Sequence, residues 1–356
     1  MRGNIVLSVN RRLVLRCFAV LVAAVLIVPK AMGGEQAGIT DVKVSAVKAS
    51  AFDIEAHRGG RALFPENTLA SFANAISMGV NTLELDIGVT RDGVLVISHE
   101  RWLNPDLTRG ADGHYVAEPG TPFVKLSLDE VKQYDVGQIR PGSIYAAQFP
   151  DQHAVPGARI PTLKELIGLV RRSGDNHVRL NIETKIDPNH PDESPPPERF
   201  VGLLLDLLRA EKFENRVTVQ SFDWRTLQLV QKLAPEIPTV YLTVQGGRDP
   251  TVFRDKASEW TAGFNPAEHG GSTPRTIKAA GGAIWSPYLR DLTPELISES
   301  HAVGLKVVVW TVNQPADMAR LIEMGVDGII SDRPDLLRQA AREKGIALPA
   351  GFPVTP

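Results

Sequence analysis

Carboxylates gather on one face of two apolar segments of the sequence. In "TLELDIG", alternate positions put Glu84 and Asp86 on one face and the leucine and isoleucine side chains on the other. In "VRLNIETKI", Glu183 and Lys185 share a face in the same way. Buried carboxylates are costly unless they are paired or bind a cation, and an all-oxygen set suits Ca²⁺ or Mg²⁺ better than Zn²⁺. The pattern indicates a divalent cation site, with a structural ion-pair network to Arg58 and Lys185 as the alternative.

Two histidines, His57 and His99, each follow an apolar segment that has the character of a strand. Histidine is the side chain best suited to move protons near neutral pH. Either residue alone is typical of a polar side chain that is merely hydrogen-bonded, but two of them beside a carboxylate cluster favour acid–base chemistry. The neighbouring Arg58 and Lys185 indicate an anionic substrate, because guanidinium groups bind phosphate oxygens in a bidentate way.

Nine strand-like segments alternate with amphipathic helical patterns and must position these side chains. The segments are residues 52–57, 82–88, 94–98, 178–184, 216–221, 238–244, 283–287, 306–312 and 327–331. Repeated β–α units predict a parallel sheet covered by helices. The Arg-Asp-Gly turn at 91–93 makes the third segment an antiparallel hairpin partner, so eight parallel strands remain and an α/β fold of (β/α)8 TIM-like type is expected. A doubly wound open sheet is the alternative, but no G-x-G-x-x-G fingerprint supports nucleotide binding in one.

Two long polar segments interrupt the alternation of strand-like and helical segments. The longer one covers about residues 100–160, directly after His99, and contains one short helical pattern, "SLDEVKQYDVG". The second, "DPNHPDESPPPER", follows the fourth strand-like segment. Long excursions after the carboxyl ends of barrel strands are where such folds build binding surfaces. We therefore expect a small insertion that contributes to the site.

The first residues have the composition of an export signal. Arginines precede an apolar run, which is shorter than the roughly 20 residues of a membrane span, and small residues follow it. The stretch "NRRLVLR" fits a twin-arginine signal, with the general secretory route equally open and an uncleaved anchor as the alternative. We expect a signal peptide at 1–33, a flexible N-terminus at 34–51, the barrel at 52–346 and a C-terminal tail at 347–356.

Composition limits the compartment and the partners. The one cysteine, Cys17, lies in the expected signal, so the mature chain has no thiol and must be stabilised by its core. Removal of the five signal cations changes the formal net charge from −2 to −7. Nucleic acid is therefore not expected as a partner, because it requires a basic surface. We expect a periplasmic or secreted protein without a stable membrane span after cleavage; its oligomeric state is left open.

The stretch "EAHRGGRALFPENTLASFANAISMGVNTLELDIGVTRDGVLVISHE" closely resembles the glycerophosphodiester phosphodiesterase family. Its hallmarks are His-Arg-Gly, Pro-Glu-Asn-Thr, Glu-x-Asp, Thr-x-Asp-Gly and a second His. Later matches are "IETK", "VQSF", "VVVWTVN" and "GVDGIISDRPDLL". The resemblance runs in register from about residue 53 to 338, with looser matches in the insertion and at about 245–280. The set is highly specific, whereas "HRG" alone would be weak.

The resemblance implies a TIM-like barrel with a small insertion after the second catalytic histidine. It implies hydrolysis of a small-molecule glycerophosphodiester to sn-glycerol 3-phosphate and an alcohol. It also implies one divalent cation, Ca²⁺ ahead of Mg²⁺, held by the residues Glu84, Asp86 and Glu183. His57 and His99 would be the acid–base pair, and the family suggests His57 as the acid and His99 as the base.

Further roles follow from the same resemblance. Arg58 and Lys185 would hold the phosphate, with Arg58 also stabilising charge in the reaction. Phe222 and Trp310 match aromatic positions near the pocket, and core packing is the alternative for Phe222. Glu100 departs from the family, which usually has Asp there, and would orient His99 or shape the first turn of the insertion. Two other functions stay open: lysophospholipase D or PI-PLC-like activity on a lipid phosphodiester, and non-catalytic phosphoester binding.

Overall fold

Eight parallel strands close into a barrel in the computed structural model, which describes residues 52–247 and 249–356. The strands are β1 (Asp53–Ala56), β2 (Thr82–Val89), β4 (Arg179–Thr184), β5 (Val217–Ser221), β6 (Thr239–Thr243), β7 (Ile284–Pro287), β8 (Lys306–Val309) and β9 (Gly328–Ser331). Each pairs in parallel with the next, and β9 pairs with β1. The predicted (β/α)8 barrel is confirmed.

The ninth strand-like segment is the expected hairpin partner. β3 (Leu95–Ile97) runs antiparallel to β2, with Ile87 opposite Ile97. The connecting turn closes through a hydrogen bond from Gly93 N to Thr90 O of 2.9 Å, and Gly93 has a φ of 81° that favours glycine. The hairpin therefore lies outside the ring of eight parallel strands.

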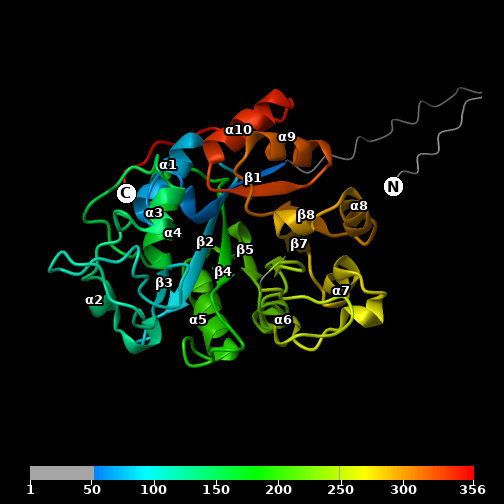
Figure 1. Ribbon diagram of the computed structural model, residues 1–356, viewed down its shortest axis with the longest axis horizontal. Helices are drawn as coiled ribbons and strands as arrows, with labels where there is room; N and C mark the ends of the chain where they lie inside the picture. The colour runs from blue at the N-terminus through cyan, green and yellow to red at the C-terminus, as the bar shows by residue number, and fades with distance from the viewer. Residues whose placement is uncertain (1–51, 248) are drawn as a thin grey trace, which may run out of the picture. The chain divides into compact units, whose positions relative to one another are not determined.

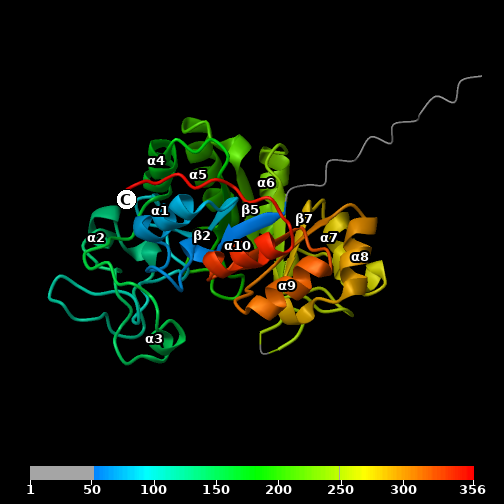
Figure 2. The ribbon, with the colours of Figure 1, turned by 90° about the horizontal axis from the view of Figure 1, so that it is seen from above.

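Helices surround the strands (Figures 1 and 2). They are α1 (Leu69–Met78), α4 (Leu163–Ser173), α5 (Pro197–Ala210), α6 (Trp224–Leu233), α7 (Thr273–Ala279), α8 (Pro294–Ala302), α9 (Pro315–Glu323) and α10 (Pro334–Glu343). The start of α1 is set by Thr68, whose hydroxyl accepts from Ser71 N at 3.2 Å, and its end by Gly79 in a left-handed conformation. No helix among the described residues is long and apolar enough to cross a membrane.

The interior of the barrel is polar on one side. The outward-facing Leu83 and Leu85 of β2 are fully buried in the main core, which lies between strands and helices. Inside the ring, Gln220 donates to Glu84 at 2.7 Å, and Asn181 donates to both Gln220 and Glu55 at 3.0 Å. These hydrogen bonds satisfy polar side chains that would otherwise be expensive to bury.

The insertion after β3 forms a small core of its own. Its buried side chains include Leu103, Phe123 and Ile160, packed against Val96 of β3. It carries α2 (Leu128–Val131), which lies in the predicted helical pattern, and α3 (Ile144–Gln148), which was not predicted. A helix of five residues is too short to show a helical period in the sequence.

The last residues of the chain pack against α1. Phe352 N donates to Ile76 O at 3.0 Å, and Val354 N to Ser77 Oγ at 3.3 Å. The two backbones approach so closely that a Cβ on Gly351 would lie 2.1 Å from Ser77 O. The expected signal peptide and N-terminal segment lie outside the described residues.

Candidate active site

The chain reverses direction directly after β1. Arg58, Gly59 and Gly60 have φ values of 51°, 79° and 90°, all in the left-handed region. A Cβ on Gly59 would lie 2.5 Å from Ser71 Oγ, so only glycine fits there. Arg58 keeps its unfavourable conformation because its N donates to Glu84 Oε2 at 2.8 Å. The turn places His57 and Arg58 at the carboxyl end of β1, where barrels build active sites.

Three carboxylates meet at the same end of β2 and β4. The parallel register sets Asp86 opposite Glu183, with Glu84 two residues earlier on β2. One oxygen of each lies within 4.8 Å of the others, and all three residues are buried. Burial raises the pKa of Glu84 well above its usual range and that of Glu183 to about 7. For Asp86, the charges of His99, Lys185 and Arg58 outweigh burial and hold the pKa well below its usual range.

The same carboxylates offer lone pairs to a cation. Asn67 donates to Asp86 Oδ2 at 3.0 Å, while the buried Asp86 Oδ1 has no hydrogen-bond partner and lies 3.7 Å from Lys185 Nζ. Gln220 and Arg58 N each hold one oxygen of Glu84, so its orientation is fixed from both sides. A divalent cation fits this donor set, because the oxygens are close together, oriented and incompletely satisfied.

Two cationic side chains lie beside the carboxylates. Arg58 donates through Nη1 to Glu66 Oε1 at 2.7 Å, while its buried Nε has no hydrogen-bond partner and lies 3.5 Å from Asp86 Oδ2. Lys185 Nζ lies 2.8 Å from Glu183 Oε1. A buried guanidinium N–H without a partner is a strong donor for an anion that enters the cavity.

Each histidine is held at Nδ1 by a carboxylate. His57 Nδ1 lies 2.5 Å from Asp332 Oδ1, and His99 Nδ1 lies 2.8 Å from Glu100 Oε1. Burial lowers the pKa of His57 to about 4, although Asp332 opposes this. Burial, reinforced by the charges of Arg58 and Lys185, also lowers the pKa of His99. Both rings are then neutral near pH 7, and Nδ1–H donation leaves Nε2 of each ring able to accept a proton.

Asp332 is a site residue that the analysis of residue types missed. It follows β9 and accepts from Arg61 Nε and from Asn313 Nδ2, both at 2.7 Å, in addition to His57. The only available signal was its place in the motif "GVDGIISDRPDLL". The site contacts of Glu66 and Asn67 were likewise not predicted, and the only signal for them was their place in the motif "FPENT".

A cavity of about 130 Å³ joins these groups. It is lined by His57, Arg58, Arg61, Glu84, His99, Glu183, Gln220, Phe222, Leu242, Trp310, Thr311 and Ile330. Seven of the nine predicted site residues are in this set, and the other two, Asp86 and Lys185, contact Arg58 and Glu183 respectively. The rings of Phe222 and Trp310 meet edge to face, 5.4 Å apart, in the cavity wall.

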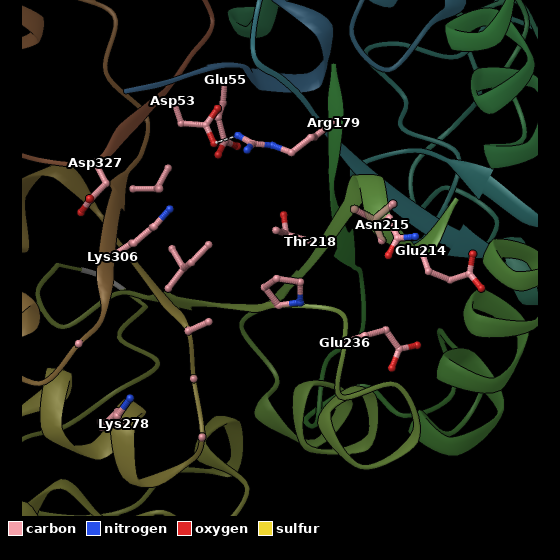
Figure 3. Close-up of a pocket in the computed structure, with 18 residues that line it drawn as sticks. Asp53, Glu55, Arg179, Glu214, Asn215, Thr218, Glu236, Lys278, Lys306 and Asp327 are labelled. Carbon is pink, nitrogen blue, oxygen red and sulfur yellow. Dashed lines mark hydrogen bonds and ion pairs between the residues drawn. The ribbon is translucent and has the colours of Figure 1, made fainter. Parts of the chain in front are cut away.

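A larger cavity, of about 760 Å³, lies at the opposite, amino end of the strands (Figure 3). Both acidic and basic side chains line this cavity. Figure 3 shows the side chain of Arg179 extending to its ion-pair partner, Asp53. Glu55 lies at its edge and accepts from Asn181 at 3.0 Å. None of the described residues that line it is a histidine. The smaller cavity is the candidate active site because, among the cavities lined by described residues, it is the one that combines histidine bases and cationic side chains with the carboxylates that could hold a metal ion.

Comparison with known proteins decides the family. The sequence model of the glycerophosphoryl diester phosphodiesterase family matches residues 57–336, which include all the site residues described above. The chain belongs to this family. Membership confirms the resemblance and the enzyme class that were predicted from the sequence, a phosphoric diester hydrolase.

Relatives of this phosphodiesterase cover most of its length. A glycerophosphodiester phosphodiesterase of Caldanaerobacter subterraneus subsp. tengcongensis is 31% identical over 294 residues, which are 82% of this chain and 98% of the relative. A candidate glycerophosphoryl diester phosphodiesterase from Silicibacter pomeroyi DSS-3 has a solved structure that is 35% identical, with a TM-score of 0.74 over 84% of this chain and 95% of that one. The structure of an Oleispira antarctica phosphodiesterase in complex with the product sn-glycerol-3-phosphate shares the fold, at 23% identity and a TM-score of 0.60, over 82% and 97% of the two chains.

Glu100 is the residue for which the sequence resemblance led us to expect Asp. The longer side chain reaches His99, and burial notwithstanding, the hydrogen bond and charge of His99 lower the pKa of Glu100 to about 2. Of the two roles open to it, Glu100 therefore contacts the histidine directly. It stays ionised at neutral pH, as a group that orients a neighbouring imidazole must.

Proposed function

We propose that this chain hydrolyses glycerophosphodiesters to sn-glycerol 3-phosphate and an alcohol. The observation that carries the proposal is the composition of one small cavity. Two neutral imidazoles, a guanidinium whose Nε has no hydrogen-bond partner and two of the three clustered carboxylates line it, and the third, Asp86, lies beside them. The names of the relatives support the substrate class, and the bound product of the Oleispira antarctica phosphodiesterase supports the product.

The divalent cation would be held by Glu84, Asp86 and Glu183. The unpartnered Asp86 Oδ1 is the strongest support, because a buried acceptor without a donor is expensive unless something binds it. When bound, the cation supplies Lewis-acid stabilisation of charge on the phosphoryl group. Ca²⁺ is proposed ahead of Mg²⁺ because the resemblance is to exported members of the family.

Arg58 and Lys185 bind the phosphoryl oxygens. Arg58 uses the Nε–H that has no protein acceptor, while Glu66 fixes the other end of its guanidinium. Such preorganised donors stabilise the charge that grows as phosphorus becomes five-coordinate. Phe222 and Trp310 form an apolar wall beside the reacting centre and exclude water from it.

His57 and His99 transfer the protons. One removes a proton from the nucleophile as the new P–O bond forms. The other must first bind a proton at Nε2, and it gives this proton to the alcohol as its P–O bond breaks. The nucleophile is the neighbouring glycerol hydroxyl, which gives a cyclic phosphate first, or water. The family pattern assigns the acid to His57 and the base to His99.

The direct test is release of sn-glycerol 3-phosphate from glycerophosphocholine by the purified mature chain, with and without EDTA. We expect turnover that EDTA abolishes and Ca²⁺ restores, and at least a thousandfold loss of activity in His57→Ala and His99→Ala. Full activity in EDTA would exclude the cation. Absence of release from a panel of glycerophosphodiesters and lysophospholipids would exclude the function.

We also propose that the protein is exported to the periplasm or beyond the cell. The basic and apolar leader at 1–33 supports this proposal. Cell fractionation and N-terminal sequencing of the mature chain test it. A cytoplasmic protein that still begins at residue 1 would overturn it.

A further inference from the structure

We propose that Tyr145, in the insertion, is a positioning residue for this reaction, joining the groups that hold Arg58 to the groups that hold His57. The proposal rests on the proposed function. Tyr145 donates its hydroxyl hydrogen to Glu66 Oε2, and its oxygen accepts from Arg61 Nη1 at 3.1 Å. It does not line the active-site cavity, so it acts through these two neighbours.

The first neighbour leads to the phosphate-binding arginine. Glu66 holds Arg58 Nη1 through Oε1 at 2.7 Å and Tyr145 through Oε2, so both of its oxygens are engaged. Glu66 is buried, and a buried carboxylate with one free oxygen would turn toward another donor. Loss of the Tyr145 hydroxyl therefore releases Glu66, and with it the direction in which Arg58 Nε points.

The second neighbour leads to the catalytic histidine. Arg61 donates Nε to Asp332 Oδ1 at 2.7 Å, the same oxygen that lies 2.5 Å from His57 Nδ1. Arg61 and Asp332 thus connect Tyr145 to His57 through hydrogen bonds. Without the acceptor at Nη1, Arg61 keeps its bond to Asp332 but loses the contact that fixes the plane of its guanidinium.

Contacts within the insertion, and between it and the turn after β1, hold Tyr145 in this position. Ser143 caps α3 by accepting from Ala146 N at 3.0 Å, and the ring of Phe149 meets that of Tyr145 edge to face at 5.2 Å. The guanidinium of Arg61 lies 5.0 Å from the centre of the Phe149 ring. Gln152 also donates to Arg61 O at 2.6 Å. These contacts tie the insertion to the turn after β1.

The Tyr145 hydroxyl has a pKa that keeps it a hydrogen-bond donor. Burial, reinforced by the negative charge of Glu66, raises the pKa of Tyr145 above its ordinary value. The hydroxyl therefore stays protonated at neutral pH and can donate to Glu66.

The test compares Tyr145→Phe with Tyr115→Phe on glycerophosphocholine. Tyr115 is in the same insertion, and its hydroxyl donates to Gln138 O at 3.1 Å, so the control removes a hydroxyl without touching the site. We expect Tyr145→Phe to lower kcat and raise KM, with kcat/KM reduced about tenfold, and Tyr115→Phe to match the wild type. Tyr145→Phe keeps the ring and its contact with Phe149, so we expect its melting temperature to equal that of the wild type. Equal melting temperatures would show that the variant is folded.

Double variants separate positioning from a merely structural role. If Tyr145 acts through Arg61 and Glu66, Tyr145→Phe adds little to the loss of kcat in Arg61→Ala and little to the rise of KM in Glu66→Gln, because the link is already cut. Fully multiplicative losses, or a Tyr145→Phe enzyme with wild-type kcat and KM, would overturn the proposal. A wild-type chain without turnover on any phosphodiester would instead refute the proposed function.

Discussion

Both histidines use a carboxylate at Nδ1, but the two carboxylates differ in how they are fixed. Asp332 is nearly inaccessible and accepts from His57, Arg61 and Asn313, whereas Glu100 is the immediate neighbour of His99 in the chain. The imidazole of His57 is therefore held by a network that spans three elements, and that of His99 by a local contact. The orientation of His57 depends more on the rest of the fold.

The first prediction concerns the carboxylate of Asp332. Asp332→Asn keeps the shape of the side chain but can offer His57 an N–H in place of an acceptor, which disfavours the tautomer that leaves Nε2 free. We expect kcat to fall by between about tenfold and a hundredfold, with little change in KM. Asp335→Asn, at a partly exposed ion pair with Arg333, is the matched control and should keep full activity. Equal kcat in the two variants would contradict the role of Asp332.

The second prediction concerns stability at acid pH. Although burial opposes it, the charges and hydrogen bonds of His57 and Arg61 hold the pKa of Asp332 well below its usual range. A depressed carboxyl pKa stabilises the fold above the unfolded value of about 4, and this stability is lost as pH falls toward the folded value. The difference in free energy of unfolding between wild type and Asp332→Asn should therefore shrink below pH 4. Urea denaturation in EDTA measures it, and a constant difference from pH 6 to pH 3 would contradict it.

At the scale of elements, the turn after β1 does the most to place the site. Three successive residues with positive φ bring the chain back against α1, and Thr68 begins that helix within the same short segment. The reversal presents His57 and Arg58 to the cavity and leaves Gly59 wedged against Ser71.

The third prediction compares two glycines with nearly equal φ. Gly59→Ala, at a φ of 79°, would bring Cβ to 2.5 Å from Ser71 Oγ, whereas Gly113→Ala, at a φ of 83°, meets nothing within 4 Å. We expect Gly113→Ala to lose about 1 kcal/mol of unfolding free energy from backbone strain alone. Gly59→Ala should lose about 2–3 kcal/mol because the clash adds to the strain. Urea denaturation of both variants measures the difference, and equal losses would refute the steric argument.

Most strands and helices could be predicted from the sequence. The contacts between side chains that are distant in the sequence could not. Alternation along β2 and β4 placed Glu84, Asp86 and Glu183 on the inner face, and the Arg-Asp-Gly turn separated β3 from the parallel strands. The partner of His57 lies 275 residues further along the chain, so no local period indicates it. α3 carries Tyr145 on a helix that is too short for a periodic pattern, and its contact with Glu66 depends on how the insertion folds back.

For the whole molecule, the barrel separates two cavities with different chemistry. The candidate active-site cavity lies at the carboxyl ends of the strands, and the larger cavity of Figure 3 lies at their amino ends. The inner hydrogen bonds among Glu84, Gln220, Asn181 and Glu55 run between them. A cation at the carboxylate trio would thus be anchored to the barrel interior as well as to the loops.

The fourth prediction follows from this anchoring. A ligand that binds only the folded chain raises its stability, and Ca²⁺ at a hundred times its Kd should raise Tm by about 5 °C. EDTA should reverse the rise. Asp86→Asn should show no rise, because it removes the carboxylate whose Oδ1 has no protein donor, whereas Asp129→Asn on the exposed surface of the insertion should behave as wild type. Thermal unfolding followed by circular dichroism measures all three, and a Ca²⁺ response retained in Asp86→Asn would contradict the assignment.

The packing of the last residues on α1 has a consequence for biosynthesis. α1 is complete once Met78 has been made, yet the backbone groups of Ile76 and Ser77 find their partners in Phe352 and Val354. The pairing of β1 with β9 likewise needs residues up to Ser331. Residues up to Val354 must therefore be synthesised before the first β–α unit can make all of these contacts. We expect a nascent chain truncated before residue 349 to leave the side of α1 that the tail covers open to proteases.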